Sequence, residues 1–268
     1  MSLFVPSSVL SPESLGTIEV FGTILSTQTQ SLLIALSELG IKFIHHPAMP
    51  NSPEVSQLSP FGTIPVMVHR PSAIYASKDI VCFYEMSAIA QYIDEVLNVQ
   101  SSAEGKSDAL MPKLADSHSG KYADSALLRA EVRQLCSVIR TYIQNVVEDQ
   151  YVKPYFALRN NGASESDISV ALSEQLDTAI SALIYLERII HNVQQKLNIG
   201  ADADFLFGKP TWVAAHLFPI LRDFRATGPK VLIGGPNERL PHLTKFLQSF
   251  ENRPSAQAVL KGTFAASA

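Results

Sequence analysis

Hydroxyl and amide side chains gather at residues 25–30, in the stretch LSTQTQ between an alternating segment and a helical one. Upstream, TIEVFG alternates apolar and polar residues as a strand does, and downstream SLLIALSELG has apolar residues at helical spacing. Thr27 and Gln30 have the spacing of a capping box, which satisfies backbone N–H groups at a helix start. Alternatively, the hydroxyls and amides of this stretch hold a negatively charged group at the helix N-terminus. The sequence leaves both interpretations open.

The segments around this stretch predict a small mixed sheet covered by helices. IKFIHH (residues 41–46) alternates again, which indicates a second strand parallel to the first and a βαβ unit. Two further apolar runs, IPVMVH (64–69) and DIVCFY (79–84), read as strands, and EMSAIAQYIDEVL (85–97) has helical spacing. We therefore expect an α/β domain over residues 18–99, after a short extension at 1–17.

A polar segment at residues 100–120, rich in Ser, Asp and Gly, reads as a linker, and beyond it only helical periods appear. The spelling SESD at 164–167 predicts the start of a second long helix. Residues 121–268 should form an all-helical domain. The first long helix has one apolar stripe, made of Leu135, Val138, Ile139, Tyr142, Ile143 and Val146.

Composition limits the function classes. The net charge of −4 and the pI near 6.0 leave no basic footprint, so we expect no nucleic-acid partner. No apolar run approaches the ~18 residues of a membrane span, and the N-terminus lacks the pattern of a signal peptide. Cys82 and Cys136 are far apart, without metal-ligand spacing, which favours a reduced, cytoplasmic protein without a metal site.

Four motifs together resemble the glutathione transferase superfamily, with the closest similarity to phi-like and serine-type fungal-style transferases. They are VFGTILSTQTQSLLIALSELG, SPFGTIPVM, YEMSAIAQYI and FENRPSAQAVL, in the family's order and over nearly the whole chain. The chain is also similar to the transferase-like domain of translation elongation factor gamma subunits. The resemblance implies a thioredoxin-like, glutathione-binding domain followed by an all-α domain that lines the substrate pocket.

The resemblance also implies roles for individual residues. Ser26, with Thr27 beside it, matches the hydroxyl that donates to the glutathione sulfur. Ile64 matches the residue whose backbone pairs with the cysteinyl part of glutathione, and Pro65 matches a cis-proline; an ordinary trans proline at a strand start fits the sequence equally. Glu85 matches the acid that takes the γ-glutamyl ammonium, although an acidic residue also suits a first helical turn.

Several ligand positions depart from the family pattern. Met86 replaces the serine that binds the γ-glutamyl carboxylate, Thr63 replaces a glutamine, and Asn51 stands where a basic residue is usual. In the helical half, Thr211 begins a capping box whose aspartate is replaced by Ala214, at a cost of about 1 kcal/mol for a lost cap. We expect weaker or repositioned glutathione binding.

Two functions from different classes follow. The first is an enzyme in which Ser26 activates the glutathione thiolate for addition to a hydrophobic electrophile, or for reversible addition that isomerises a double bond in a biosynthetic pathway. The second is a non-catalytic binding or assembly module. The resemblance further implies a homodimer that pairs the thioredoxin-like half with the partner's helical half. Four aromatic residues read either as helix core or as pocket wall: Tyr142, Tyr151, Tyr155 and Phe156.

Overall fold

The computed structural model describes residues 15–72, 80–98, 109–115, 121–200, 203, 205–232 and 238–266. Most of the predicted N-terminal extension and most of the predicted linker lie outside these residues. The chain divides into two compact units, Met1–Leu110 and Met111–Ala268. The division falls inside the predicted linker. That linker is not polar throughout, because Ala109, Leu110 and Met111 are buried.

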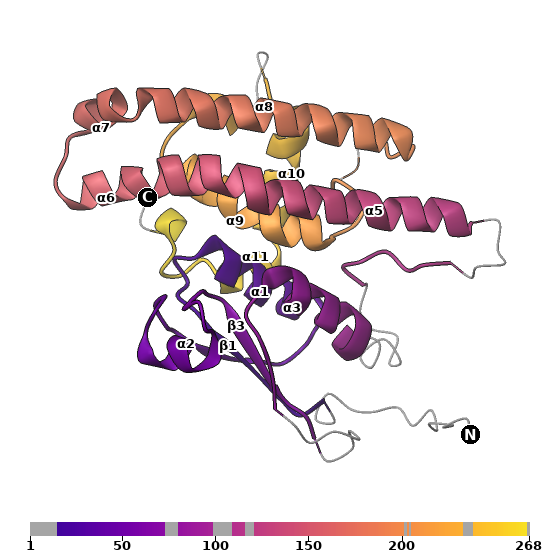
Figure 1. Ribbon diagram of the computed structural model, residues 1–268. Helices are drawn as coiled ribbons and strands as arrows, with labels where there is room; N and C mark the ends of the chain where they lie inside the picture. Colours follow the sequence, from indigo (N-terminus) through magenta and orange to yellow (C-terminus); the bar gives the residue numbers. More distant parts are fainter. Residues whose placement is uncertain are drawn as a thin grey trace, which may run out of the picture. The chain divides into compact units, whose positions relative to one another are not determined.

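Unit 1 combines strands and helices (Figure 1). Its four-stranded sheet has the strand order β2-β1-β3-β4. Strand β1 pairs in parallel with β2 and antiparallel with β3, which pairs antiparallel with β4, so the predicted βαβ unit is confirmed. The strands are β1 (Thr17–Phe21), β2 (Ile44–His46), β3 (Val66–Arg70) and β4 (Val81–Phe83). The helices are α1 (Thr27–Glu38), α2 (Pro53–Leu58), α3 (Met86–Tyr92) and the π-helical η2 (Ile93–Leu97).

Strand β2 begins three residues later than the alternation at residues 41–46 predicts, because Ile41 ends the preceding helix. The Ile41 N–H donates to the Leu36 carbonyl (2.9 Å), and the Gly40 N–H donates to the Ser37 carbonyl (3.1 Å). Gly40 has a φ of 66°, which this helix-ending motif requires. The buried Ile41 is therefore used to close α1 and not to extend the sheet.

Helices α2 and α3 cover opposite faces of the sheet. On one face, Val66 and Val68 of β3 pack with Val55 of α2 in a buried cluster. Side chains alternate along a strand, and His69 of β3 is also buried, with its Nδ1 lying 2.7 Å from the Tyr92 hydroxyl of α3. Helices therefore pack on both faces of the sheet at β3.

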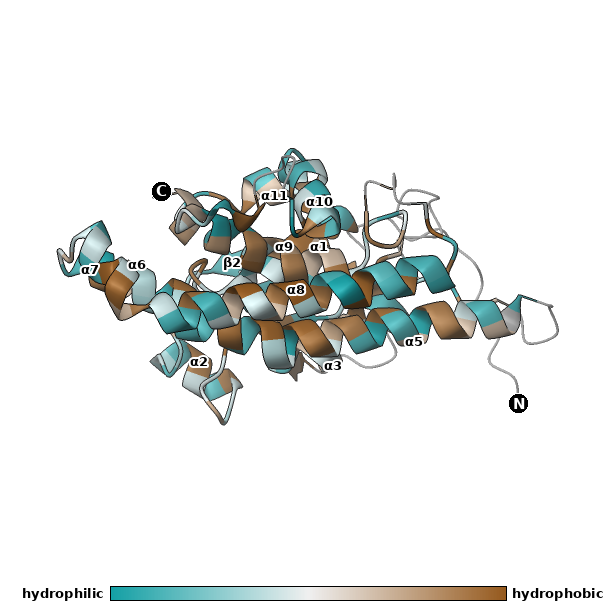
Figure 2. Cartoon of the chain, turned by 90° about the horizontal axis from the view of Figure 1, so that it is seen from above, coloured by the Kyte–Doolittle hydropathy of each residue, from teal (hydrophilic) through white to brown (hydrophobic). Residues whose placement is uncertain are grey.

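Every described element of unit 2 is a helix, which confirms the predicted all-α half. The first helical run continues through three registers, α5 (Tyr122–Val138), π-helical η4 (Ile139–Val152) and α6 (Lys153–Asn160). The other helices are α7 (Glu165–Ala171), α8 (Ser173–Lys196), α9 (Trp212–Ala226), 3₁₀ η5 (Lys230–Leu232), α10 (Pro241–Glu251), α11 (Pro254–Ala258) and 3₁₀ η6 (Phe264–Ala266). Figure 2 shows hydrophilic and hydrophobic residues interleaved along α5 and α8, the pattern of half-buried helices.

Two helix predictions for unit 2 were wrong in detail. Ile143 of the predicted stripe is buried, but Tyr142 is 65% exposed, because η4 pairs residues i and i+5 and the buried stripe continues from Ile143 to Val147. Ser164 of the SESD motif does cap a helix, since its Oγ accepts from the Asp167 N–H (3.2 Å), but that helix is the short α7. The long helix α8 starts separately at Ser173.

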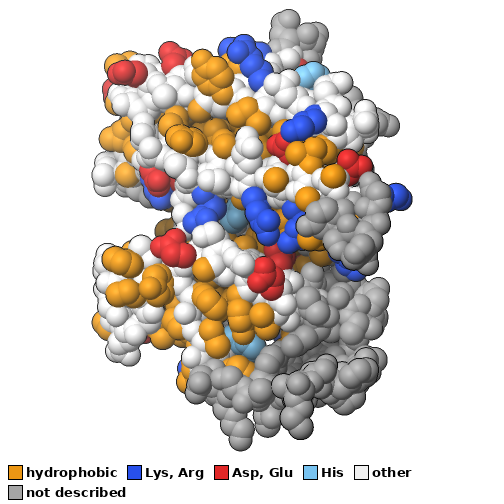
Figure 3. Space-filling view, turned by 45° about the vertical axis from the view of Figure 1, so that its right-hand side comes forward, with side chains coloured by type: hydrophobic (Ala, Val, Ile, Leu, Met, Phe, Trp, Pro, Cys, Tyr) orange, Lys and Arg blue, Asp and Glu red, His pale blue; other side chains and the backbone are white. Residues whose placement is uncertain are grey.

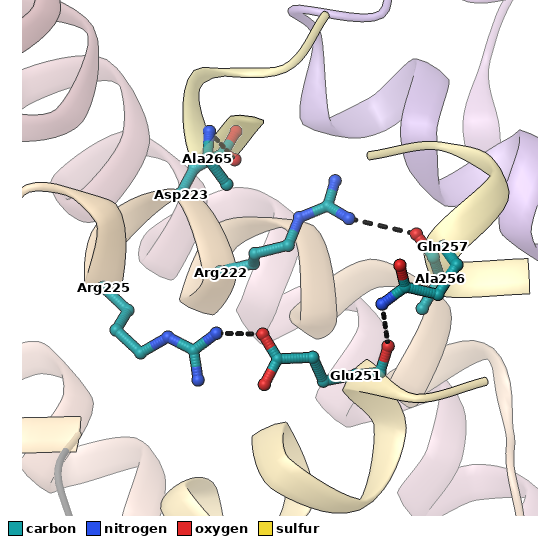
Figure 4. Close-up of polar contacts among 7 residues, drawn as sticks. All are labelled: Arg222, Asp223, Arg225, Glu251, Ala256, Gln257 and Ala265. Carbon is teal, nitrogen blue, oxygen red and sulfur yellow. Dashed lines mark hydrogen bonds and ion pairs between the residues drawn. The ribbon is translucent and has the colours of Figure 1, made fainter. Parts of the chain in front are cut away.

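Three polar side chains of α9 hold the segment that follows it in the sequence (Figure 4). Arg222 donates to the Ala256 carbonyl (3.1 Å), and Asp223 accepts from the Ala265 N–H (3.3 Å). Arg225 forms an ion pair with the glutamate that ends α10. At its N-terminus α9 starts from Thr211 without a side-chain capping bond among the described residues, as the loss of the capping box predicts.

Charges of both signs are interspersed between apolar patches on the face drawn in Figure 3. Within the described parts of the chain, none of the helices combines the length and the apolar character that crossing a membrane requires.

One carboxyl group is buried without a partner in unit 2. Glu148 of η4 is fully buried, and neither of its carboxyl oxygens has a hydrogen-bond partner among the described residues. Burial raises the pKa of Glu148 well above its usual range, and the nearby Asp223 carboxylate raises this pKa further. Glu148 therefore keeps its proton in the folded protein at a pH where the unfolded chain has released it.

Glu148→Gln is expected to stabilise the protein at neutral and alkaline pH. The folded state binds the Glu148 proton more tightly than the unfolded state, so the wild type loses stability as pH rises above about 4.5. A neutral amide removes this loss. Urea unfolding at several pH values measures the effect. The advantage of the variant should grow from acidic to alkaline pH, and the exposed neighbour Asp149→Asn should show no such growth; parallel curves for Glu148→Gln and wild type contradict the assignment.

Candidate functional site

The sheet register brings three of the predicted ligand-binding segments to one edge of unit 1. Phe21 at the end of β1 pairs with Val66 at the start of β3, so the loop to Ser26 lies beside the loop that ends in Pro65. Met67 pairs with Phe83 of β4, and two residues after Phe83 the chain reaches Glu85 at that same edge. Strand pairing therefore places Ser26 and Glu85, which are far apart in the sequence, at the same end of the sheet.

Ser26, and not Thr27, is the N-cap of α1. Ser26 has extended backbone angles (φ −84°, ψ 119°), and its Oγ accepts from the Thr29 N–H at 3.3 Å. Thr27 is 2% exposed and lies in the first turn, and Gln30 donates to the Ile24 carbonyl (2.9 Å). The predicted Thr27–Gln30 capping box is wrong, because the helix starts one residue earlier than that box requires.

The turn before Ser26 is closely packed. The Ser26 N–H donates to the Thr23 carbonyl (3.0 Å). A side chain at Gly22 would meet Thr29 Oγ1 at 2.4 Å, so glycine alone fits where the chain leaves β1. These contacts fix the Ser26 hydroxyl, which is half-buried, at the end of the helix. Ser26 can accept from Thr29 and still donate its own proton.

The Ile64–Pro65 peptide bond is cis, as the resemblance implies. Ile64 is half-buried, and Pro65 is buried. The preceding loop is held by the Asn51 N–H, which donates to the Gly62 carbonyl (2.9 Å), and by a contact between the Ser59 and Thr63 hydroxyls (3.3 Å). Thr63 is exposed, but part of its hydrogen-bonding capacity is used within the loop.

Asn51 has a structural reason to be asparagine. Its φ is 61°, a left-handed conformation that asparagine adopts more readily than lysine or arginine. The Asn51 side chain also packs over Gly62, where an added Cβ would lie 2.0 Å from Asn51 Oδ1. A basic residue at position 51 would therefore strain this loop.

At the start of α3, Glu85 is exposed and Met86 is buried. Glu85 is the N-cap residue, is exposed, and makes no capping hydrogen bond with its side chain among the described residues. Met86 is 1% exposed, so its side chain belongs to the core and not to a ligand surface. Sequence reasoning missed Ser87, an exposed hydroxyl in the same turn, although the serine in EMS is displaced by a single position from the family pattern.

In unit 2, two of the four aromatic candidates line a cavity of about 140 Å³. The Tyr155 hydroxyl donates to the Glu165 carboxylate (2.9 and 3.1 Å), and the Tyr151 hydroxyl lies 3.3 Å from Thr227 Oγ1. Burial raises the pKa of both tyrosines, so both hydroxyls stay protonated at neutral pH. Phe156 instead stacks on Phe264 at a centroid distance of 4.7 Å, and Tyr142 is exposed.

Among the described residues, no cluster of three or more His, Cys, Asp or Glu side chains could hold a metal ion. The histidine pair at the end of β2 is engaged within unit 1. His45 Nε2 lies 2.8 Å from the Gly22 carbonyl, and His46 Nε2 lies 3.0 Å from Glu19 Oε2.

Comparison with known proteins identifies the fold. A family model described as the N-terminal domain of glutathione S-transferase matches residues 25–96. No curated protein matches the chain. Solved structures match over most of their length: glutathione transferase F7 from Populus trichocarpa is 19% identical, with a TM-score of 0.62, and the match covers 92% of this chain and 99% of that one. The thioredoxin-like unit followed by a helical unit is therefore the glutathione transferase fold.

Two further solved structures with this fold belong to proteins that are not named transferases. Ure2p in complex with glutathione is 16% identical, with a TM-score of 0.61 and coverage of 92% of this chain and 95% of that chain. Maleylacetoacetate isomerase from Anaeromyxobacter dehalogenans, with bound dicarboxyethyl glutathione and citrate, is 17% identical, with a TM-score of 0.56 and coverage of 91% and 90%. At these identities the likeness establishes the fold alone.

Proposed function

We propose that this protein binds glutathione at the sheet edge of unit 1 and activates its thiol through Ser26. The observation that carries the proposal is the Ser26 hydroxyl, which caps α1 and keeps one proton to donate. A thiolate placed there receives this hydrogen bond and also lies at the positive end of the α1 dipole, and both effects lower a thiol pKa. The match of residues 25–96 to the transferase N-terminal domain supports glutathione as the thiol.

Other residues of unit 1 bind the remaining groups of glutathione in this proposal. The backbone of Ile64, before the cis Pro65, faces the cysteinyl portion, and the exposed carboxylate of Glu85 takes the γ-glutamyl ammonium. Ser87 replaces the hydroxyl that Met86 lacks. No cation is available at Asn51 for the glycine carboxylate, so the glycine end contributes little to binding.

The substrate class follows from thiolate chemistry. The thiolate adds to an electrophilic carbon of a hydrophobic molecule, which gives a conjugate. With a conjugated double bond, the same addition allows rotation about the new single bond, and elimination then restores the double bond and releases glutathione unchanged. The isomerase of the same fold that carries a glutathione derivative supports this second course. An isomerase role in a biosynthetic pathway is consistent with an altered tripeptide site.

Calorimetric titration of glutathione into the full chain tests the proposal. Glutathione should bind, and γ-glutamylcysteine, which lacks the glycine, should bind within about threefold as tightly because Asn51 supplies no charge for the missing carboxylate. Absence of heat at millimolar glutathione would contradict the proposal. A large loss of affinity for the dipeptide would contradict the assignment at Asn51 alone.

A non-catalytic module is the second candidate, and one observation favours it. Met86 fills, with a buried apolar side chain, the position where the family has a ligand-binding serine. The likeness to Ure2p, a structure with glutathione bound, is consistent with binding that does not depend on turnover. Glutathione binding without conjugation or isomerisation of any electrophile supplied would favour this candidate.

We propose a homodimer and expect Phe61→Ser to weaken it. Phe61 is 72% exposed, and Met49 nearby in the same loop region is 59% exposed, so both would gain from burial against a second copy. Light scattering after size exclusion measures the mass over a range of concentrations. The Phe61→Ser dimer should dissociate at a higher protein concentration than the wild-type dimer, whereas the dimer of the apolar variant Phe61→Leu should dissociate at a concentration closer to that of wild type. A wild type that is monomeric at all concentrations contradicts the proposal.

A cytoplasmic location accords with the cysteine content, since Cys82 and Cys136 form no disulfide. Glutathione is kept reduced in that compartment, as a thiol-dependent reaction requires.

A further inference from the structure

The loop that carries Ser26 leaves β1 at Gly22, and neighbouring elements of unit 1 hold this glycine in place. The Gly22 N–H donates to the His46 carbonyl (3.1 Å), and His45 Nε2 lies 2.8 Å from the Gly22 carbonyl. Gly22 also packs against α1, where an added Cβ would lie 2.4 Å from Thr29 Oγ1. The start of the loop is thus fixed, and the next four residues must turn from the strand into the helix.

The Gln30 side chain holds the middle of this loop. Its Nε2 donates to the Ile24 carbonyl at 2.9 Å. The Gln30 backbone N–H donates to the Ser26 carbonyl, also at 2.9 Å. Gln30 therefore bonds to the chain both before and after the Ser26 side chain, and these two bonds restrict the direction in which the Ser26 hydroxyl can point.

The buried position of Gln30 is unusual for an amide. Gln30 is 0% exposed, and the residues after it in α1, up to Leu36, are buried as well. A buried amide costs free energy unless its groups are hydrogen-bonded, and an apolar residue would fill the same space without that cost. Helix capping does not explain the glutamine, because the cap of α1 is Ser26 and not Thr27. The bond to the Ile24 carbonyl gives this amide a role in shaping the loop.

We propose that Gln30 is a positioning residue for the Ser26 hydroxyl. This inference rests on the glutathione function proposed above and extends it to a second side chain. The Gln30 amide keeps the loop in the conformation in which Ser26 Oγ accepts from the Thr29 N–H (3.3 Å) and directs its own proton to the thiolate. Without the amide the loop gains other conformations. A displaced hydroxyl then forms a longer and weaker hydrogen bond to the thiolate and lowers the thiol pKa less.

Gln30→Met tests this role, because methionine has nearly the same length but no donor; Gln30→Leu makes the same test if the methionine variant does not fold. Gln194→Met is the matched control. Gln194 of unit 2 is also buried (4% exposed), and its Nε2 likewise donates to a backbone carbonyl, that of Leu206, at 3.2 Å. Urea unfolding of the two methionine variants should show a loss of stability of similar size, so a difference between them at Ser26 does not come from stability.

Amide hydrogen exchange without glutathione measures the loop itself. The Ser26 N–H, which donates to the Thr23 carbonyl (3.0 Å), should exchange about threefold faster or more in Gln30→Met than in wild type, and at the wild-type rate in Gln194→Met. Equal Ser26 exchange rates in wild type and Gln30→Met overturn the proposal. This measurement needs no ligand and so is independent of the function proposed at Ser26.

The pKa of the thiol of bound glutathione measures the consequence. It should rise in Gln30→Met, so that the thiolate fraction below this pKa falls about threefold or more, and should be unchanged in Gln194→Met. Adding Gln30→Met to Ser26→Ala should raise the thiol pKa no further, because Gln30 acts through the hydroxyl.

Two outcomes of the pKa measurement overturn the positioning role: no rise in Gln30→Met, or a further rise in the double variant. An unchanged thiol pKa in Ser26→Ala is a different failure. It contradicts the function proposed at Ser26, while the hydrogen exchange of the Ser26 N–H still shows whether Gln30 holds the loop.

Discussion

Alanine at position 26 is expected to lower glutathione-dependent turnover near neutral pH by about tenfold or more, because each unit of thiol pKa changes the thiolate fraction about tenfold. Ser26 supplies the hydroxyl hydrogen bond, while the α1 dipole remains in the variant. The effect should therefore shrink as pH rises and the thiol ionises without help. Rates with a chlorodinitrobenzene and with a conjugated enone, measured from pH 6 to 9, give the profile.

Two controls separate this catalytic role from helix capping. Ser26→Thr keeps both the cap and the hydroxyl, so it should retain most of the activity. Ser164→Ala removes a comparable cap from α7, at a cost of about 1 kcal/mol, and should leave the rate unchanged. If Ser26→Ala and Ser26→Thr have the same pH–rate profile, the hydroxyl does not act on the thiol.

Acidification is expected to destabilise the protein through His216. Burial in α9 lowers the pKa of His216 to about 3, with a smaller contribution from the positive charge of Arg140. The unfolded chain takes up this proton near pH 6.5 and the folded chain does not, so stability is complete above pH 6.5 and falls as pH decreases toward 3. One pKa unit corresponds to about 1.4 kcal/mol, which gives a loss of about 2 kcal/mol between pH 7 and pH 5.

His216→Phe isolates this effect, because phenylalanine can keep the ring stacked on Trp212 without a titratable group. Urea unfolding of both proteins should show the wild type losing about 2 kcal/mol more than the variant on going from pH 7 to pH 5. His191→Gln, at an exposed histidine, should behave as wild type. Identical pH slopes for wild type and His216→Phe contradict the assignment.

The architecture followed from hydrophobic periodicity, but the details depended on local backbone chemistry. Alternation located β1 and β2, short apolar runs located β3 and β4, and helical spacing located the second unit. Tyr142 was misplaced because periodicity assumes an α-helical turn, and η4 is π-helical. Thr27 was taken as the cap because Gln30 follows it at capping-box spacing, whereas the backbone angles place the cap at Ser26.

The candidate glutathione site could be predicted from the sequence only in part, because motifs identify residues but not the direction of their side chains. Motif resemblance selected Ser26, Ile64, Pro65 and Glu85, and the strand register then placed these segments at one sheet edge. The burial of Met86 could not be read from the sequence, because a methionine after a helix cap is compatible with either face.

The central claim is that the Ser26 hydroxyl stabilises a glutathione thiolate. The most direct test is a pH titration of the ultraviolet thiolate absorbance of glutathione bound to wild type and to Ser26→Ala, which requires no knowledge of the electrophile. The thiol pKa should lie below that of free glutathione in the wild type and should rise toward the free value in the variant. A bound thiol with the same pKa in both proteins, or one that titrates like free glutathione in the wild type, would contradict the claim.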